Sequence, residues 1–347
     1  MIHYFGGNLY DYQQEAEFPG YIPDTRVAWR MVSFVYHSQW KGLRDMMRTL
    51  FKEKPSKKVS LFLDSGAFSA FTKGVEISIQ DYIDFIKENK KYIDVYANLD
   101  VIGDAEATLK NQRIMEKQGL SPIPCFHYGE PWKYLDLYLS EYDYIAIGGM
   151  ARVSKRGLHF LDLCFDKICD KEGTPTIKVH GFAITSLKLM LRYPWYSVDS
   201  TSWVLTGRMG DILVPQKRNG AYDYCLEPMK VSISARSSSD GTEKHVNNMS
   251  PSILKITKEY TNFLGMEIGK SKFSRKPANY ELKSNERWIS QVENDGTREI
   301  ETIVTPGLCN NYRLRDQVNI MYFLGLEKQI PPWPNAKFIR KGMRSLL

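Results

Sequence analysis

Short apolar runs alternate with longer amphipathic stretches between residues 28 and 215. The runs are rich in β-branched and aromatic residues and are often continuous, which is typical of strands covered on both faces. We predict eight such strands, at 31–36, 59–63, 93–99, 122–127, 144–147, 176–180, 195–198 and 211–214.

The stretches between these strands have the periodicity of helices. Residues 78–91 place Ile79, Tyr82 and Ile86 on one stripe, behind Ser78 as a helix N-cap. Regular alternation of strand and helix predicts parallel pairing through right-handed crossovers. Eight repeats favour an α/β fold of the (β/α)8 type, a closed TIM barrel, over an open doubly wound sheet. Further helices are predicted at 105–118, 158–171 and 185–191.

The alternation of predicted strands and helices ends after residue 215. Residues 216–245 predict an irregular hairpin, 251–264 a helix, and 312–326 a second helix that we expect to close the barrel. We therefore expect a TIM-barrel catalytic core at 1–215 and an insertion with a C-terminal extension at 216–347, which ends in a basic tail.

The composition is that of an ordinary globular protein, with 43% hydrophobic and 25% charged residues in a chain of 347. No apolar run approaches the roughly 20 residues of a membrane helix. The first residues lack the basic start and apolar segment of a signal peptide. Five scattered cysteines show no CxxC spacing of a zinc ribbon or redox motif. We expect a cytoplasmic protein with reduced cysteines and no membrane contact.

A net charge of +7 favours a polyanionic partner. Aromatic residues make up 13% of the chain, which suits stacking against bases, although most such rings belong to protein cores. We expect basic residues to contact a nucleic acid, and most of the candidates lie late in the chain. They are Arg208, Lys270, Lys272, Arg275, Lys276, Arg340 and Lys341.

The active sites of (β/α)8 barrels form where the strands end. In this chain the strand ends carry aspartates, histidines and glycines that we expect to converge on one pocket. Each alone has an ordinary explanation, because aspartates cap helices, glycines form turns and histidines occur in cores. The residues are Asp64, Ser65, Gly66, Asp100, His127, Gly148, Gly149, Met150, His180, Gly181 and Asp199.

Two other enzyme classes use similar residues. His127 and His180 with the aspartates would suit a metal site of the amidohydrolase type. Such enzymes usually carry a His-x-His pair after the first strand, where this chain has only His37. A glycosidase also needs two carboxylates, but the sequence offers no tryptophan-rich sugar cleft. We therefore predict no metal site.

Four segments at these strand ends resemble the tRNA-guanine transglycosylase superfamily. They are LFLDSGAFS (61–69), ANLDVIGD (97–104), YIAIGGMA (144–151) and YSVDSTSW (196–203). Within the superfamily, the chain is most similar to the DpdA-type enzymes of phages and bacteria, which insert 7-deazaguanines into DNA. The resemblance covers roughly residues 28–215 in the correct order, and DSGAFS is its most specific element.

The resemblance implies a role for each matching residue. Asp199 would be the nucleophile that attacks the sugar C1′ and expels guanine, and Asp64 would be the general acid and base. Asp100 would accept hydrogen bonds from the base, and backbone amides around Gly148 and Gly149 would hold its carbonyl oxygen. The base pocket would also include Ser65, Gly66, His127, Met150, His180 and Gly181. Rings that could stack on an extruded base are Phe68, Tyr128 and Trp203.

The sequence departs from the tRNA enzymes, whose insertion carries a zinc site of closely spaced cysteines and a histidine. Here that region has only Cys225, Cys309 and an isolated His245, so we predict no structural zinc and no cofactor. Ser69 stands where the tRNA enzymes commonly have glutamine. These differences favour DNA as the polymer and a 7-deazaguanine such as preQ0 as the small substrate. A tRNA-guanine transglycosylase and a non-catalytic nucleic-acid-binding barrel stay open as alternatives.

Overall fold

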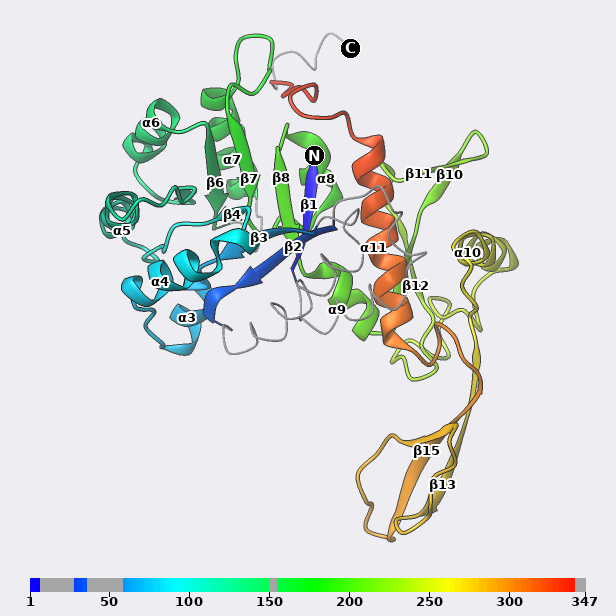
Figure 1. Ribbon diagram of the computed structural model, residues 1–347. Helices are drawn as coiled ribbons and strands as arrows, with labels where there is room; N and C mark the ends of the chain where they lie inside the picture. Colours follow the sequence, from blue (N-terminus) through cyan, green and yellow to red (C-terminus); the bar gives the residue numbers. More distant parts are fainter. Residues whose placement is uncertain (7–27, 36–58, 150–154, 341–347) are drawn as a thin grey trace. The chain divides into compact units, whose positions relative to one another are not determined.

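The computed structural model describes residues 1–6, 28–35, 59–149 and 155–340 (Figure 1). The chain forms two compact units. The first comprises Met1–Thr201 together with the C-terminal segment from Ile330, and the second comprises Ser202–Gln329. We expected the boundary at residues 215 and 216, whereas the compact units divide at Thr201 and Ser202.

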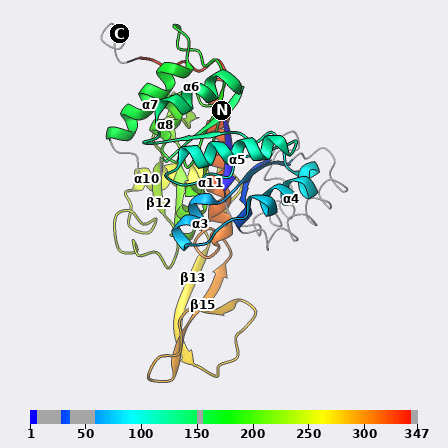
Figure 2. The same ribbon diagram turned by 90° about the vertical axis from the view of Figure 1, so that its left-hand side faces the viewer.

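The first unit is built on one sheet of eight parallel strands. The sheet is strongly curved, like part of a TIM barrel (Figures 1 and 2). Its strand order is β4-β3-β2-β1-β8-β7-β6-β5. The strands are β1 (Ile2–Gly6), β2 (Ala28–Ser33), β3 (Val59–Asp64), β4 (Val95–Tyr96), β5 (Cys125–His127), β6 (Tyr144–Gly148), β7 (Lys178–Gly181) and β8 (Ser197–Ser200).

The two edge strands of this sheet, β4 and β5, do not form a ladder with each other. A single parallel bridge joins Ala97 to Ile123. The Ile123 amide donates to the carbonyl oxygen of Tyr96, and the Asn98 amide donates to that of Ile123, each at 3.0 Å. The structure therefore confirms a TIM-like curved parallel sheet, but not the fully closed barrel that we predicted.

One of the eight predicted strands was assigned to the wrong sheet. Residues 211–214 form β9 (Asp211–Val214), which pairs antiparallel with β12 (Met229–Ser232) in the second unit. The eighth strand of the large sheet is β1, which pairs in parallel with both β2 and β8. Both segments are short and largely apolar, so pairing between distant parts of the chain decides which one joins the sheet.

The predicted helices of the first unit are present. In α4, Ser78 caps the helix by accepting the Asp81 amide at 3.2 Å, while Tyr82, Ile83 and Ile86 are fully buried. Helices α4, α5 and α7 flank the outer side of the sheet (Figure 2). The unit contains α3 (Ala67–Lys73), α4 (Ile79–Asn89), the 3-10 helix η2 (Lys90–Tyr92), α5 (Ala105–Lys117), α6 (Trp132–Glu141), α7 (Lys155–Ile168) and α8 (Leu187–Arg192).

Inside the curve of the sheet, apolar side chains from several strands pack together. This cluster includes Tyr4, Phe62, Cys125 and Ala146, all nearly or completely buried. Such a packed interior fixes the spacing of the strand ends, where the predicted site residues lie.

The second unit holds the two helices predicted after residue 250. The polar side chain of Asn319 in α11 accepts the Leu213 amide at 2.8 Å and donates to the Trp203 carbonyl at 3.0 Å. The helix that we expected to close the barrel thus packs on β9 and α9 within the second unit. Its elements are α9 (Ser202–Arg208), β9, β10 (Gln216–Arg218), β11 (Ala221–Asp223), β12, α10 (Pro251–Phe263), β13 (Lys270–Pro277), β14 (Glu286–Trp288), β15 (Thr297–Thr305) and α11 (Tyr312–Gln329). Among the described residues, no helix is long and apolar enough to cross a membrane.

Candidate active site at the strand ends

The predicted aspartates lie at or just beyond the carboxyl ends of three strands of the large sheet. Asp64 ends β3, Asp199 lies in β8, and Asp100 follows β4. Because all strands of the sheet run in parallel, these ends meet at one rim. The charges of Asp199 and Asp100 both act on Asp64, so the three carboxyl groups share one electrostatic environment.

The surroundings of Asp64 shift the pKa of its carboxyl group. It keeps slight solvent contact but lies deep among protein atoms. Burial raises the pKa of Asp64 to about 7; a hydrogen bond from the Gly66 backbone opposes the rise, and repulsion from Asp199 and Asp100 adds to it. At neutral pH this carboxyl is present in both protonated and ionised forms, which suits a group that gives and takes a proton.

Asp199 is held in a fixed orientation. Its Oδ1 accepts the Ala183 amide at 2.8 Å and lies 3.4 Å from Nε2 of His180. The side chain is largely buried, with 8% of the residue exposed. Ala183 has a φ of +54°, a left-handed conformation that costs a non-glycine residue about 1 kcal/mol. The backbone is thus strained at the point where it holds the carboxylate.

His180 supports Asp199 from inside the sheet. Its Nδ1 lies 2.7 Å from the Ser197 hydroxyl, which lies 2.7 Å from the Tyr144 hydroxyl. Burial lowers the pKa of His180 in spite of the opposing effect of Asp199, so the imidazole is neutral at pH 7. The ring is completely buried. We predicted that His180 would contact the base, but the structure gives it a position behind Asp199 instead.

A second hydrogen-bonded group surrounds His127 at the end of β5. Its Nε2 lies 3.3 Å from Asp100 Oδ2, and its Nδ1 lies 3.2 Å from Glu130 Oε1. Glu130 also accepts the His127 backbone amide at 2.9 Å. The ring is thereby clamped between two carboxylates, which orients Asp100.

His127 carries a positive charge in this arrangement. Burial alone would lower the pKa of His127, but Cys125 and Asp100 beside it raise the pKa well above its ordinary value. Burial raises the pKa of Cys125 to about 12, so that thiol is neutral at pH 7. The carboxylates of Asp100 and Glu130 on the two sides of the ring therefore favour the protonated form of His127.

Asp100, Cys125 and His127 also form the one group of three metal-ligating side chains found among the described residues, with ligand atoms within 4.8 Å of one another. A metal here would have to replace the proton that His127 Nε2 shares with Asp100. The same three residues thus explain one another by hydrogen bonding and charge without requiring a metal.

The predicted glycines allow close packing around this group. A Cβ on Gly148 would lie 2.6 Å from Cδ2 of His127, and Gly149 has a φ of +78°. Gly66, two residues after Asp64, has a φ of +79° and is the N-cap of α3, and a Cβ there would lie 2.4 Å from the Ser33 hydroxyl. These positions favour glycine because a side chain would displace a neighbour or strain the backbone.

Other predicted site residues have local structural roles. Ser65 is buried, and its hydroxyl accepts the Ala67 amide at 3.4 Å near the start of α3. A Cβ on Gly181 would meet Ile184 at 2.6 Å. Met150 lies outside the described residues.

Of the predicted stacking rings, Phe68 and Tyr128 are exposed to 62% and 48%. Both therefore have a surface on which a base could stack. Trp203 is 1% exposed, so it cannot stack on a base.

The basic residues predicted on β13 do not share one face. Side chains alternate along a strand, so Lys272 and Lys276 lie on one face and Arg275 on the other. Arg275 pairs with Glu293 at 2.8 Å. Arg340, in the first unit, donates to Asp166 and to backbone carbonyls at the end of α7, and Lys341 lies outside the described residues. Arg208 is exposed in the second unit.

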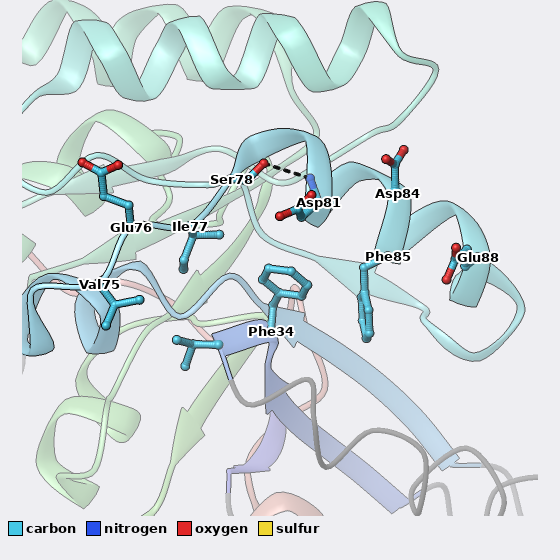
Figure 3. A pocket seen from close by; sticks show the side chains of 10 residues that line it. Phe34, Val75, Glu76, Ile77, Ser78, Asp81, Asp84, Phe85 and Glu88 are labelled. Carbon is cyan, nitrogen blue, oxygen red and sulfur yellow. Dashed lines mark hydrogen bonds between the residues drawn. The ribbon is translucent and has the colours of Figure 1, made fainter.

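A cavity of 390 Å³ beside α4 contains none of the predicted site residues (Figure 3). Its apolar wall includes Phe34 and Phe85, whose ring centroids lie 5.2 Å apart. Four carboxylates stand around it, on Glu76, Asp81, Asp84 and Glu88. This acidic rim would repel a phosphate backbone.

Several contributors to the site were not predicted from the sequence. Glu130 clamps His127, while Ser197 and Tyr144 orient His180. The position of Glu130, three residues after His127, was the one available signal. The site thus combines one carboxyl group of shifted pKa, one fixed carboxylate and one carboxylate oriented by a charged histidine.

No protein-family model matches this chain, and no curated protein is similar to it in sequence.

Proposed function

We propose that this chain is a DNA-guanine transglycosylase that exchanges guanine for a 7-deazaguanine, preQ0 or a relative, through a covalent glycosyl-aspartate. The observation that carries the proposal is the placement of three carboxyl groups, those of Asp64, Asp100 and Asp199, at one rim of the parallel sheet. Burial and the charges of the other two raise the pKa of Asp64 to about 7. The TIM-like sheet would act as a (β/α)8 barrel, with its strand ends as the floor of the site.

In the first step, Asp199 attacks C1′ of the target nucleotide. A bond forms between a carboxylate oxygen and C1′, and the bond from C1′ to the base breaks. The electron pair of that bond leaves with guanine, which takes the proton of Asp64. Guanine is a poor leaving group, so a covalent intermediate divides one high barrier into two lower ones.

In the second step, the ionised Asp64 removes a proton from the incoming 7-deazaguanine. The freed nitrogen attacks C1′, and Asp199 leaves as a carboxylate. Asp64 returns to its protonated form, so protons and charge balance over the cycle. The proposed reaction needs no metal or redox cofactor, because the carboxyl groups supply both the nucleophile and the acid.

Base recognition is assigned to Asp100. Its Oδ1 is buried and has no hydrogen-bond partner among the described residues, while its Oδ2 contacts His127. A buried acceptor without a partner costs about 1–3 kcal/mol, which a donor from a bound base would recover. The N1–H and amine of a guanine-type base supply such donors, and the backbone amides near Gly148 and Gly149 would hold its carbonyl oxygen.

The DNA assignment comes from the sequence, through the missing cysteine cluster and Ser69. Base exchange within a polymer also requires the target nucleotide to leave its stack. The exposed rings of Phe68 and Tyr128 are the candidates to receive it.

The decisive experiment incubates the protein with radiolabelled guanine and duplex DNA, single-stranded DNA or tRNA. We expect label in DNA, and we expect Asp199→Asn to lower the rate on the order of 10⁴-fold, because the nucleophile is lost. Asp104→Asn is the matched control: Asp104 caps α5 by accepting the Ala107 amide at 2.9 Å, and asparagine caps equally well. Label in tRNA alone would contradict DNA as the polymer, and unimpaired exchange by Asp199→Asn would contradict the nucleophile.

A further inference from the structure

The second unit contains a cavity of 550 Å³ whose lining is rich in arginine. Four arginines line it, together with two aromatic residues, and its lining includes no aspartate or glutamate. A cavity of this size accommodates about one nucleotide or a ligand of similar volume. The six residues are Arg208, Arg236, Arg287, Arg315, Trp288 and Tyr312.

Arg315 forms part of the cavity floor and is 5% exposed. Its Nε donates to the Gly207 carbonyl at 2.7 Å and its Nη1 to the Leu308 carbonyl at 2.6 Å. Burial lowers the pKa of Arg315, yet a guanidinium stays charged at neutral pH. A fixed positive charge therefore lies at the bottom of the cavity.

Arg287 is also fixed, but its charge is balanced. Its Nε donates to the completely buried Glu301 at 2.8 Å, and its Nη2 donates to the Asn310 carbonyl at 2.7 Å. The negative charge of Asp316 acts on Arg315 and partly offsets its charge. The excess positive charge of the cavity therefore comes from Arg208 and Arg236.

Arg208 and Arg236 are exposed at the mouth of the cavity. Arg236 donates from Nη2 to the Ile289 carbonyl at 3.1 Å, and this bond leaves its other donors available. The neighbouring Trp288 is kept in place by Arg298, whose guanidinium carbon lies 4.5 Å from the centre of its ring. The guanidinium groups of Arg208 and Arg236 thus line the same cavity as the aromatic ring of Trp288.

We infer that this cavity binds the phosphodiester backbone of a nucleic-acid strand, with phosphate held by Arg208 and Arg236 and a nucleoside against Trp288 or Tyr312. The choice of a nucleic acid as the ligand rests on the proposed function. The guanidinium fork matches the oxygens of a phosphate, and aromatic rings stack on any base. An acidic peptide would use the arginines but not the rings.

The test measures binding of a short fluorescein-labelled single-stranded DNA by fluorescence polarisation over a range of salt concentrations. Arg208→Ala/Arg236→Ala is compared with Lys244→Ala/Lys255→Ala, which removes the same charge from exposed positions of the second unit outside the cavity. We expect the arginine pair to weaken binding on the order of tenfold and to reduce the slope of log K against log salt by about 2, about 1 for each phosphate contact that is lost. The lysine pair should change binding less than twofold. Circular dichroism confirms that each variant is folded.

Competition identifies the ligand class. Unlabelled DNA should displace the probe far better than inorganic phosphate or polyglutamate, and Trp288→Leu should weaken binding without changing the salt slope, because it removes stacking and no charge. Equal effects of the two double variants, or equal competition by polyglutamate and DNA, would overturn the inference. Base exchange is assayed separately. If Arg208→Ala/Arg236→Ala binds DNA normally and the protein exchanges guanine, the inference about the cavity is wrong and the proposed function stands. If DNA binding depends on the two arginines but the protein exchanges no guanine, the proposed function is wrong and the inference stands.

Discussion

The two units concentrate opposite charges by different physical means. In the first unit, Asp64, Asp100 and Asp199 gather at the strand ends, where burial and repulsion change the protonation of Asp64. In the second unit, Arg315 remains charged although it is buried, because backbone carbonyls accept from its guanidinium. Carboxyl groups can respond to crowding by taking up a proton, whereas arginine cannot release one at neutral pH. The first arrangement suits proton transfer, and the second suits binding of a fixed anion.

The largest expected effect comes from removing the titratable carboxyl group of Asp64 in the first unit. Asp64→Asn should lower the rate of guanine exchange by about 10²- to 10⁴-fold, the usual contribution of general acid and base catalysis. Wild-type activity should be greatest near pH 7, because Asp64 acts as an acid in one step and as a base in the other. Initial rates of labelled-guanine exchange between pH 5 and 9 measure both effects. A wild-type optimum far from 7, or a variant that keeps the same pH profile, would contradict the role of Asp64.

The same substitution should make the protein more stable at alkaline pH. The folded pKa of Asp64, about 7, lies above the ordinary value of 3.8, so its stabilising contribution is complete below the unfolded pKa and is lost as pH rises through 7. Asp64→Asn should therefore raise the free energy of unfolding by about 2–4 kcal/mol at pH 8 and by little at pH 4. Urea unfolding at the two pH values gives the difference. Asp104→Asn, at an exposed cap, should show no such pH dependence.

Packing beneath the proposed base site should have a smaller effect. In Gly148→Ala the new methyl group would lie 2.6 Å from Cδ2 of His127, which Asp100 and Glu130 prevent from moving freely. We expect a loss of about 1–3 kcal/mol in stability and a higher KM for the free base, with a smaller change in kcat. Gly74→Ala is the control, because its φ of +65° makes alanine costly although nothing lies within 4 Å. An unchanged KM for Gly148→Ala would contradict a role of this glycine in base binding.

The strand-end residues could be predicted because their grouping depends only on the direction of the strands. Parallel strands place their carboxyl ends together, so Asp64, Asp100 and Asp199 could be grouped before any contact was known. The prediction for residues 211–214 is wrong because it depends on which strands pair, and not only on their direction. The sequences of β1 and β9 are both short and apolar, and only pairing with distant strands decides which of them joins the large sheet.

Side-chain contacts were beyond the reach of sequence patterns. The pKa of Asp64 depends on burial and on two carboxylates distant in the chain, and Asp199 is oriented by the amide of Ala183. The arginine cavity was hidden for the same reason. Arg208 and Arg315 stand more than a hundred residues apart, in α9 and α11, and no spacing in the sequence connects them.

The smallest expected effect separates two faces of β13 in the second unit. Lys272 is exposed on one face, whereas Arg275 lies on the other and pairs with Glu293 at 2.8 Å and Asp295 at 3.8 Å. Lys272→Ala should weaken DNA binding by about fivefold at low salt, since it removes one available phosphate contact. Arg275→Ala should change binding less than twofold, because its charge is already offset by the two carboxylates. Fluorescence polarisation at two salt concentrations measures both. If Arg275→Ala proves the more harmful, the backbone follows the face opposite to Lys272, and the excess charge of β13 is not what attracts it.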